Sequence, residues 1–376
     1  MKSIAKMPLF LLIVTFVAAF SLADILTPDG IYSESENRYL QKMPRATMQS
    51  VINGEFSSSY ETYISDQFLL REGWITMKSA SETMLLKTEN NDIVYGRNGY
   101  MFPKFSKFNN RVLQNNLASI DKFAAEMKAP VAVMILPSKY HPLIDEVPAG
   151  FPFVNQNYYI TEINGYLSTN ADIVNAKDIL TINSQRYIYY RTDHHWTNYG
   201  AWLAYCQLAS VAGFTPFEYE SRHMLTVDRF YGTNYSKCHK IGTKADSITY
   251  YDFGIQSLIA DDEEYDSLYS LEQFGKRDKY AAFIQGNNGL TIIESEYSDE
   301  KLGSILIIKD SFANSLIPLL TEHYNKLYVI DPRFYNYQNG YGQFADMDFD
   351  QVLIAYSFET IVAPSSINYL SLDFED

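Results

Sequence analysis

Residues 131–136 read Val-Ala-Val-Met-Ile-Leu, a run in which every side chain is apolar. A strand that is apolar on both faces is typical of the interior of a parallel sheet covered by helices on each side. Pro137 ends the run, so Ser138 and Lys139 are expected at the carboxyl edge of that sheet, where open α/β sheets hold their binding crevice. We therefore predict an α/β fold built around this strand.

The same alternation of helix and strand patterns continues on both sides of this strand. Apolar periodicity and turn signals predict a hairpin at 95–100, where Asn-Gly favours a tight turn, helices at 109–127, about 161–169, 198–212 and about 315–324, and strands near 172–175 and at 304–308, 326–330 and 351–356. Such alternation is typical of a three-layer α/β/α domain with a mainly parallel sheet.

Two stretches do not follow this alternation of helices and strands. Residues 24–90 are predicted to form an N-terminal helical collar, because apolar residues recur every three or four positions from 55 onward. In the collar, Asp66 and Arg71 form either an exposed ion pair or a fixed buried one, and we favour the solvated pair. Residues 215–300 are rich in Tyr, Asp, Gly and Ser and are predicted to be an insertion of loops and hairpins within a single domain covering 24–376.

Composition indicates a well-packed protein that does not bind nucleic acid. The 376 residues are 47% hydrophobic and 15% aromatic, which is enough for a large core. The formal charge of −15 and the lack of a Lys/Arg cluster argue against binding a phosphate backbone. Cys206 and Cys238 are the only cysteines, which excludes a Cys-based zinc framework. They form either one disulfide or two buried thiols.

The first segment has the pattern of an export signal. Lys2 and Lys6 precede an apolar stretch, and Ser21-Leu22-Ala23 places small residues at positions −3 and −1 before Asp24. Residues 1–23 are therefore a cleaved signal peptide, or residues 7–23 stay as a membrane tether. Cleavage would change the formal charge to (30 − 2) − 45 = −17. Either way, the protein is expected outside the cytoplasm.

The motif Asp193-His194-His195-Trp196-Thr197 concentrates acid–base groups in a chain with six histidines. On an extended segment, Asp193 and His195 would point to one side and His194 to the other. A carboxylate that accepts one imidazole proton fixes the tautomer and prepares the other nitrogen as a general base. The alternative is a pair of hydrogen-bonded structural histidines.

Ser311 follows the apolar strand at 304–308 and precedes a helical segment. Its hydroxyl is expected at the sheet edge, where backbone N–H groups can stabilise an oxyanion. We predict Ser311 as nucleophile, His195 as base and Asp193 as the orienting carboxylate. The alternative is that Ser311 is a helix N-cap, a role that Asp310 could equally fill. The block lacks the Gly-x-Ser-x-Gly nucleophile elbow.

Other residues are weaker candidates. Asn287, in a glycine-flanked amide loop, could donate to an oxyanion or form a plain turn. Arg333 could hold a substrate oxygen or a structural carboxylate. Asp193, His194 and His195 could ligate zinc with His223 or His239, but no His-x-x-x-His spacing occurs, so neither a metal nor a cofactor is predicted.

These motifs together resemble the DHHW protein family. Asp193-His194-His195-Trp196-Thr197 matches the motif that names the family, and residues 309–315, Lys-Asp-Ser-Phe-Ala-Asn-Ser, look like its serine block. Similarity extends over roughly residues 31–340 and includes Glu36-Asn37-Arg38, Asp66-Gln67-Phe68, Gly286-Asn287 and Asp331-Pro332-Arg333. The chain is more distantly similar to the SGNH-hydrolase-like catalytic domains of alginate O-acetyltransferases.

The resemblance implies an SGNH-hydrolase-like fold with a circularly permuted motif order, in which Asp193 and His195 precede Ser311. Lys309 stands where the SGNH serine block usually has Gly, and no separate carbohydrate-binding module is visible after residue 360. The activity that the resemblance implies is O-acyl transfer: an acetyl group would pass through an acyl-serine to a hydroxyl of a cell-surface polysaccharide, with a membrane-bound acyltransferase as donor. The alternatives are an acetyl- or acylesterase with the same triad, and a non-catalytic glycan-binding or assembly factor.

Overall fold

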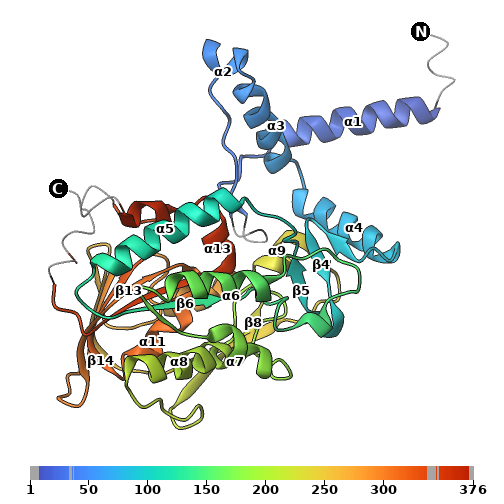
Figure 1. Cartoon of the computed structure of the whole chain (residues 1–376). Helices are drawn as coiled ribbons and strands as arrows, with labels where there is room; N and C mark the ends of the chain where they lie inside the picture. Colours follow the sequence, from blue (N-terminus) through green and yellow to red (C-terminus); the bar gives the residue numbers. More distant parts are fainter. Residues whose placement is uncertain (1–7, 34–35, 37, 337–343, 345–346, 372–376) are drawn as a thin grey trace. The chain divides into compact units, whose positions relative to one another are not determined.

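The computed structural model describes residues 8–33, 36, 38–336, 344 and 347–371 (Figure 1). The chain forms two compact units. The first, called the collar unit here, comprises residues 1–90 and 236–242, and the second, the sheet unit, comprises 91–235 and 243–376. Every candidate catalytic residue lies in the sheet unit.

The sheet unit is built on an eight-stranded sheet in the order β11-β10-β12-β14-β13-β15-β6-β7. Its strands from β14 to β7 are all parallel, whereas β12, β10 and β11 are added to one side by antiparallel pairing. The strands are β6 (Val131–Leu136), β7 (Asp172–Ile173), β10 (Ile255–Ala260), β11 (Glu263–Tyr265), β12 (Leu290–Ser295), β13 (Leu302–Lys309), β14 (Tyr324–Ile330) and β15 (Gln351–Ser357).

The apolar run at 131–136 is a fully buried strand in this sheet. Its alternate side chains enter two separate cores, since Val133 packs in one and Met134 in the other. Helices cover both faces, as Figure 1 shows, so the predicted three-layer α/β/α fold is confirmed. One face carries α5 (Asn110–Glu126), α6 (Gln156–Leu167) and α13 (Phe358–Val362), and the other α7 (Ala176–Ile182), α8 (Asn198–Ala212) and α11 (Ile317–Leu320).

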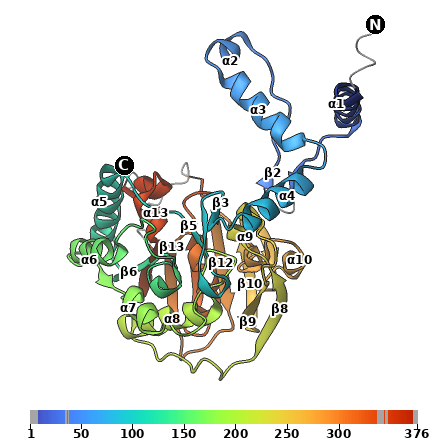
Figure 2. The same cartoon turned by 90° about the vertical axis from the view of Figure 1, so that its right-hand side faces the viewer.

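The predicted insertion at 215–300 is wrong for its second half. The ribbon of β8 (Met224–Phe230) and β9 (Asp246–Tyr251) does form a separate hairpin, visible in Figure 2. However, β10, β11 and β12 join the main sheet, because β12 pairs with β14. Side chains of β12 alternate between buried and partly buried, so the strand lacks the continuous apolar run of the interior strands.

Local turn chemistry accounts for two further outcomes. The hairpin at 95–100 is confirmed: β4 (Ile93–Tyr95) pairs with β5 (Met101–Pro103), and Asn98 and Gly99 have φ values of 52° and 82°. The single helix predicted at about 315–324 is wrong. A short 3₁₀ segment, η5 (Ser311–Ser315), precedes the four-residue α11, and β14 already begins at Tyr324.

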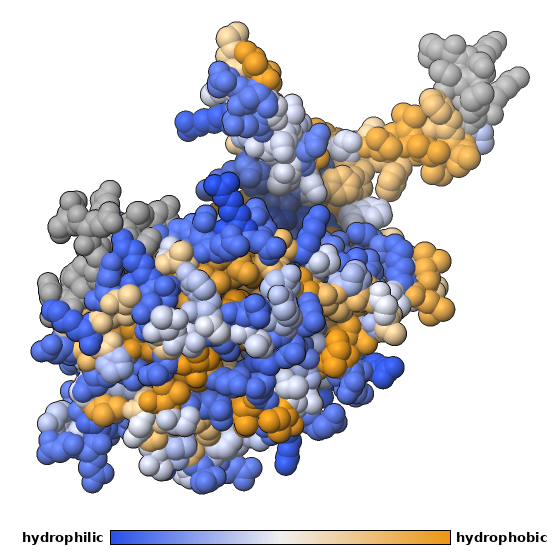
Figure 3. Space-filling view, viewed as in Figure 1, coloured by the Kyte–Doolittle hydropathy of each residue, from blue (hydrophilic) through white to orange (hydrophobic). Residues whose placement is uncertain are grey.

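The collar unit is mostly helical. Helix α1 (Pro8–Leu26) is strongly apolar and largely exposed, and it forms a hydrophobic surface in Figure 3. Its length and composition fit either a signal or an anchor, and Lys2 and Lys6 lie outside the described residues. The remaining elements are β1 (Tyr32–Ser33), β2 (Arg38–Tyr39), α2 (Met48–Ile52), α3 (Glu55–Gln67), α4 (Arg71–Met84) and β3 (Glu89–Asn90).

A network of ion pairs joins the collar segments. Asp66 is only 4% exposed and receives two hydrogen bonds from Arg38, at 2.8 and 2.5 Å. Arg71 pairs with Glu36 at 2.7 Å and also lies 3.8 Å from Asp66 Oδ1. The pairing of Asp66 with Arg71 is therefore present, but as the buried alternative and not as the solvated one. The main partner of Asp66 is Arg38, which comes from a distant segment that local spacing does not indicate. Asn37 lies outside the described residues.

Cys206 and Cys238 do not form a disulfide. Cys238 is buried, and Cys206 in α8 is partly buried. The two cysteines are therefore packed thiols, which is the second of the two predicted alternatives. Burial raises the pKa of the Cys206 thiol to about 11, so this group is protonated and unreactive near neutral pH.

Candidate active site

The motif with two histidines lies in a bent loop, residues 191–197, called the histidine loop here, that leads directly into α8. Two buried charged groups bind its backbone. The buried Lys139 ammonium donates to the backbone carbonyls of Tyr190, Arg191 and Asp193 at 3.1, 3.0 and 2.8 Å. These contacts connect the loop to the end of β6.

Asp246, at the start of β9, is the second charged group that binds the loop. Its carboxylate accepts hydrogen bonds from the backbone N–H of Arg191 at 3.1 Å and of Thr192 at 2.8 Å, and from the Thr192 hydroxyl at 2.6 Å. The sequence did not identify Asp246 as part of the site. Nothing in the local pattern around residue 246 indicates that its carboxylate folds onto a loop more than fifty residues earlier.

Asp193 and His195 form a close, oriented pair. Asp193 Oδ1 lies 2.6 Å from His195 Nδ1 and accepts the His195 backbone N–H at 2.9 Å. Burial acts to raise the pKa of Asp193, but His194, His195 and these hydrogen bonds outweigh it and hold that pKa well below its usual range. The carboxylate is therefore ionised, and it fixes the tautomer in which Nε2 is free to accept a proton.

The second oxygen of this carboxylate is also held. Thr233 donates its backbone N–H to Asp193 Oδ2 at 2.7 Å. The preceding Gly232 passes so close that a Cβ there would lie 2.2 Å from the Asp193 Cβ. A glycine is therefore required for this approach of the backbone to the carboxylate.

His194 does not point away from His195, contrary to the prediction. Its ring centroid lies 3.8 Å from that of His195, and its Nδ1 lies 3.6 Å from Asp193 Oδ1. The prediction assumed an extended segment, whereas the loop is a series of bends. The possible metal-ligand atoms of Asp193, His194 and His195 lie within 4.8 Å of one another, and these residues belong to the zinc set considered above. However, Asp193 Oδ1 is already hydrogen-bonded to His195 Nδ1.

Ser311 lies at the carboxyl end of β13, as predicted, and faces the histidine loop. Asp310 rather than Ser311 caps the following 3₁₀ turn, since its side chain accepts the Phe312 N–H at 2.9 Å. The Ser311 hydroxyl is thus not used as a cap, and its Oγ lies 3.4 Å from His195 Nε2. This distance is at the long end of hydrogen bonding, as is common before substrate binds.

Aromatic and hydroxyl side chains support the imidazole. The Tyr280 ring stacks on His195 with centroids 3.8 Å apart, and its hydroxyl donates to the Phe312 carbonyl at 2.9 Å. Trp196 donates its indole N–H to the Ser315 hydroxyl at 2.8 Å. Burial raises the pKa of Tyr280, which keeps its hydroxyl neutral and able to donate. The histidine loop is thus attached to the serine block directly through Trp196 and indirectly through Tyr280.

The two weaker candidates have different surroundings. Asn287 is exposed, and its side-chain carbonyl accepts a hydrogen bond from Asn314 at 3.1 Å, which places it beside the serine block. Arg333 donates two hydrogen bonds to Asp331, which also pairs with the buried Lys309 at 3.3 Å. Arg333 therefore binds a structural carboxylate, the second of the two roles considered for it.

Glu359 is a further acidic group at this edge of the sheet, and the sequence did not identify it. It lies in the first turn of α13, directly after β15, which is hydrogen-bonded to both β13 and β6. Burial raises its pKa, although a hydrogen bond with Ser138 acts in the opposite direction. This carboxyl lies near Ser138 only because β15 is placed between β6 and β13 in the sheet.

The arrangement can move a proton from a hydroxyl to an imidazole and stabilise the cation that results. Ser311 supplies the nucleophile, His195 the base and Asp193 the counter-charge. The Ser311 backbone N–H, the first of a helical turn, and the Asn287 side-chain amide are candidate donors to an oxyanion. These are the groups that acyl transfer requires.

Known proteins are similar to this chain in sequence or in fold. The sequence model of the DHHW protein family matches residues 85–330, more than half of the chain. A DHHW family protein from Eubacterium siraeum has a similar structure, with a TM-score of 0.62 and 19% identity, over 76% of this chain and 96% of that one. PatB1 from Bacillus cereus is similar with a TM-score of 0.59 and 17% identity, over 74% of this chain and 99% of that one.

A curated protein is similar in sequence. The probable alginate O-acetylase AlgJ from Pseudomonas fluorescens is 27% identical over 195 residues, which represent 47% of this chain and 48% of that protein. The chain thus spans about half the length of this relative.

Proposed function

Because the chain belongs to the DHHW protein family, we propose that it is a serine-dependent O-acyltransferase that acts outside the cytoplasm on a hydroxyl of a cell-surface polysaccharide. The observation that carries the proposal is the contact of His195 with Asp193 at 2.6 Å on one side and with Ser311 at 3.4 Å on the other. Sequence similarity to a probable alginate O-acetylase supports acetyl as the transferred group.

In the first half of the reaction, Ser311 Oγ attacks the carbonyl carbon of the acyl donor, and its proton passes to His195 Nε2. The oxyanion that forms is stabilised by the Ser311 N–H and the Asn287 amide. Collapse of this intermediate breaks the bond to the leaving group, which takes the proton from His195. The acyl group is then an ester of Ser311.

In the second half, the acceptor hydroxyl loses its proton to His195 Nε2 as its oxygen attacks the acyl-serine. Collapse releases the acylated acceptor, and Ser311 recovers its proton. Asp193 stays ionised throughout and stabilises the imidazolium in both halves. Water in place of the acceptor would give an esterase, so the acceptor decides between the two activities. We propose a membrane-bound acyltransferase as the source of the acyl group.

The test follows acyl transfer from p-nitrophenyl acetate. The wild-type protein should release nitrophenol and gain the mass of one acetyl group on the peptide that contains Ser311. Ser311→Ala should abolish both, while Ser257→Ala, on β10 away from the site, should change neither. Equal rates for wild type and Ser311→Ala would overturn the proposal and favour a non-catalytic glycan-binding role.

Added acceptors separate transferase from esterase. With a transferase, a soluble oligosaccharide should accelerate loss of the acetyl-serine and appear as an acetylated sugar. Release of acetate at a rate independent of any oligosaccharide would instead identify an esterase.

A further inference from the structure

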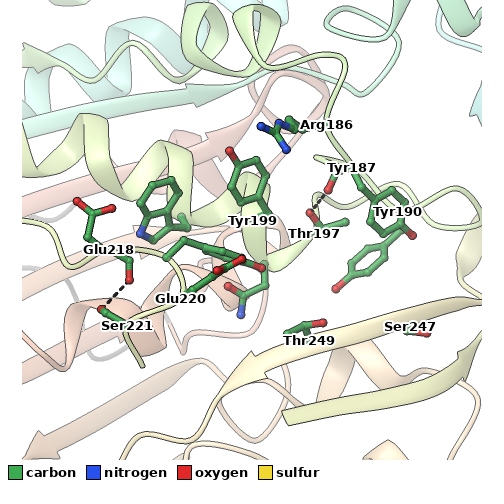
Figure 4. A pocket seen from close by; sticks show the side chains of 13 residues that line it. Arg186, Tyr187, Tyr190, Thr197, Tyr199, Glu218, Glu220, Ser221, Ser247 and Thr249 are labelled. Atoms are coloured by element: carbon green, nitrogen blue, oxygen red, sulfur yellow. Dashed lines mark hydrogen bonds between the residues drawn. The ribbon is translucent and has the colours of Figure 1, made fainter. Parts of the chain in front are cut away.

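A cavity in the sheet unit lies beside the histidine loop, and none of the residues that line it has a role in the reaction proposed above. Its volume is about 770 Å³. It is bounded by the segment that precedes the loop, by the start of α8, by the turn at 218–221 and by β9, as Figure 4 shows. A cavity of this size is in the range of small-ligand sites.

Aromatic rings form much of its wall. Tyr199 and Trp202 of α8 stack with centroids 5.8 Å apart, and Tyr219 meets both of them edge-on, at 4.9 and 5.5 Å. All three residues are only partly buried, so the cluster is not closed off as a core would be. Flat ring faces beside polar groups suit a ligand whose surface is apolar on one side and hydroxylated on the other.

The polar groups of the lining are mainly acids and hydroxyls. Glu218 and Glu220 are exposed at one side, Ser247 and Thr249 face the cavity from β9, and Arg186 is the only cation among the described residues that line it (Figure 4). This balance disfavours a polyanion, because too little positive charge is present to neutralise it, and fits a neutral molecule rich in hydroxyl groups.

Two buried side chains of the lining hold polar atoms that need a partner. Asn198 Oδ1 and the Tyr190 hydroxyl are buried, and neither has a hydrogen-bond partner within the described part of the chain. Buried polar atoms without partners are rare in folded proteins, and they occur where water or a ligand completes the site.

The cavity also adjoins the proposed catalytic residues through the backbone. Tyr190 donates its N–H to the His195 carbonyl at 3.2 Å, and the Thr197 hydroxyl donates to the Tyr187 carbonyl at 2.6 Å. A ligand in the cavity would therefore contact Tyr190, which precedes the histidine loop, and Thr197, the last residue of the loop.

We propose that this cavity, called the aromatic pocket here, binds a short stretch of an uncharged glycan. We assign the pocket to the polysaccharide acceptor, and this assignment rests on the proposed function. Sugar rings pack against Tyr199, Trp202 and Tyr219, and their hydroxyls bond to Glu218, Glu220 and Thr249.

Binding is tested by calorimetry and by tryptophan fluorescence with cellotetraose and N-acetylchitotetraose as neutral probes and an alginate tetramer as the anionic one. At least one neutral probe should bind and change the emission, since Trp202 is in the pocket whereas Trp196 is fully buried. Trp202→Phe should remove the change in emission. Thr249→Trp, which fills the pocket from a strand, should weaken binding about tenfold or more.

The matched control is Gln256→Trp, which places the same side chain at an exposed position of β10 outside the pocket. It should bind the probes as the wild type does. Preference for the alginate tetramer, or equal affinity of wild type and Thr249→Trp, would overturn the proposal.

Ser311→Ala distinguishes failure of the pocket from failure of the proposed function, because this variant should bind the probes with unchanged affinity. Binding without any acyl transfer by the wild type would leave the pocket standing and remove the proposed activity. If the wild type transfers acyl groups but Thr249→Trp binds the probes as tightly as the wild type does, the proposed function stands and the proposal for the pocket fails.

Discussion

Asp193 is the residue on which the geometry of the site most depends. Its carboxylate receives the imidazole and backbone N–H of His195 through one oxygen and the Thr233 N–H through the other. It is buried, and its depressed pKa keeps it ionised. A buried carboxylate with three N–H donors is rigid, so the orientation of His195 follows from that of Asp193.

Asp193→Asn should lower kcat for acyl transfer by roughly 10³- to 10⁴-fold with little change in KM. An amide in this position favours the wrong imidazole tautomer, which leaves Nε2 without a lone pair for the Ser311 proton. Steady-state kinetics with p-nitrophenyl acetate provide the measurement. The control is Asp252→Asn, which alters an exposed Asp–His pair, Asp252 with His223 at 3.3 Å, and should have no effect. A loss of less than tenfold would argue against the orienting role.

Glu359→Gln should raise the melting temperature at neutral pH. Burial raises the pKa of Glu359, so the folded state binds its proton more tightly than the unfolded chain does. The contribution of this bound proton to the stability of the fold is complete below the pKa of the unfolded chain, about 4.3. It is lost as pH rises through the pKa of Glu359 in the folded protein. Glu359→Gln has no ionisable group at this position and no such loss. The difference in melting temperature between the variant and the wild type should therefore grow from near zero at about pH 4 to a maximum above the pKa of Glu359 in the folded protein.

Thermal unfolding of both proteins across this pH range measures the difference. The exposed Glu300→Gln is the matched control, and it should give a flat difference. A Glu359→Gln advantage that is the same at all pH values would show that ionisation is not its cause.

At the scale of elements, one carboxylate joins three parts of the sheet edge. Asp310 Oδ1 caps η5 through the Phe312 N–H, and Oδ2 accepts the Ser357 N–H at 3.0 Å, the Ser357 hydroxyl at 2.7 Å and the Thr360 hydroxyl at 2.6 Å. The serine turn after β13 is thereby fixed to the end of β15 and the first turn of α13. Capping by Asp310 is also what leaves Ser311 available.

Asp310→Ala should lower the free energy of unfolding by about 3 kcal/mol, because several donors to a buried charge lose their acceptor together. Urea unfolding of the whole chain measures this. It should also lower kcat, since the turn that positions Ser311 loses its attachment to β15. Asp348→Ala, at an exposed position, is the control. An unchanged free energy of unfolding would show that the four hydrogen bonds contribute no net stability.

At the scale of the whole molecule, the chain divides its tasks between two units. The sheet unit holds all the candidate catalytic residues, whereas the collar unit carries the apolar helix α1. Within the collar, the N–H of Leu69 donates to Asp24 at 2.7 Å, and Phe20 contacts Phe68 with ring centroids 5.3 Å apart. The end of α1 is thus packed onto the collar.

Asp66→Ala should loosen the collar without affecting catalysis. It removes the buried acceptor of two Arg38 donors and of the Gln41 N–H, so limited proteolysis should cut the collar about tenfold faster. Acyl transfer should keep its wild-type rate, because the reacting groups lie in the other unit. Asp29→Ala, which removes an exposed contact with Tyr63, is the control. Unchanged cleavage would show that the ion pairs do not hold the collar together.

The sequence by itself determined the elements that depend on neighbouring residues. Continuous apolar runs identified β6, β13 and β15, and the Asn98-Gly99 pair identified its hairpin, because such features arise from side chains close together in the chain. The motifs at 193–197 and 309–315 likewise singled out Asp193, His195 and Ser311. The residues to which the proposed chemistry is assigned therefore follow from sequence motifs alone.

Tertiary structure decided what depends on distant segments. Whether Ser311 could reach His195, 116 residues away, depended on the strand order. So did the roles of Lys139, Asp246 and Glu359, the capping of the serine turn by Asp310, and the inclusion of β10 to β12 in the main sheet. The physical reason is that hydrogen-bond partners are chosen by proximity in space, and residue spacing encodes that proximity only within a single helix, strand or turn.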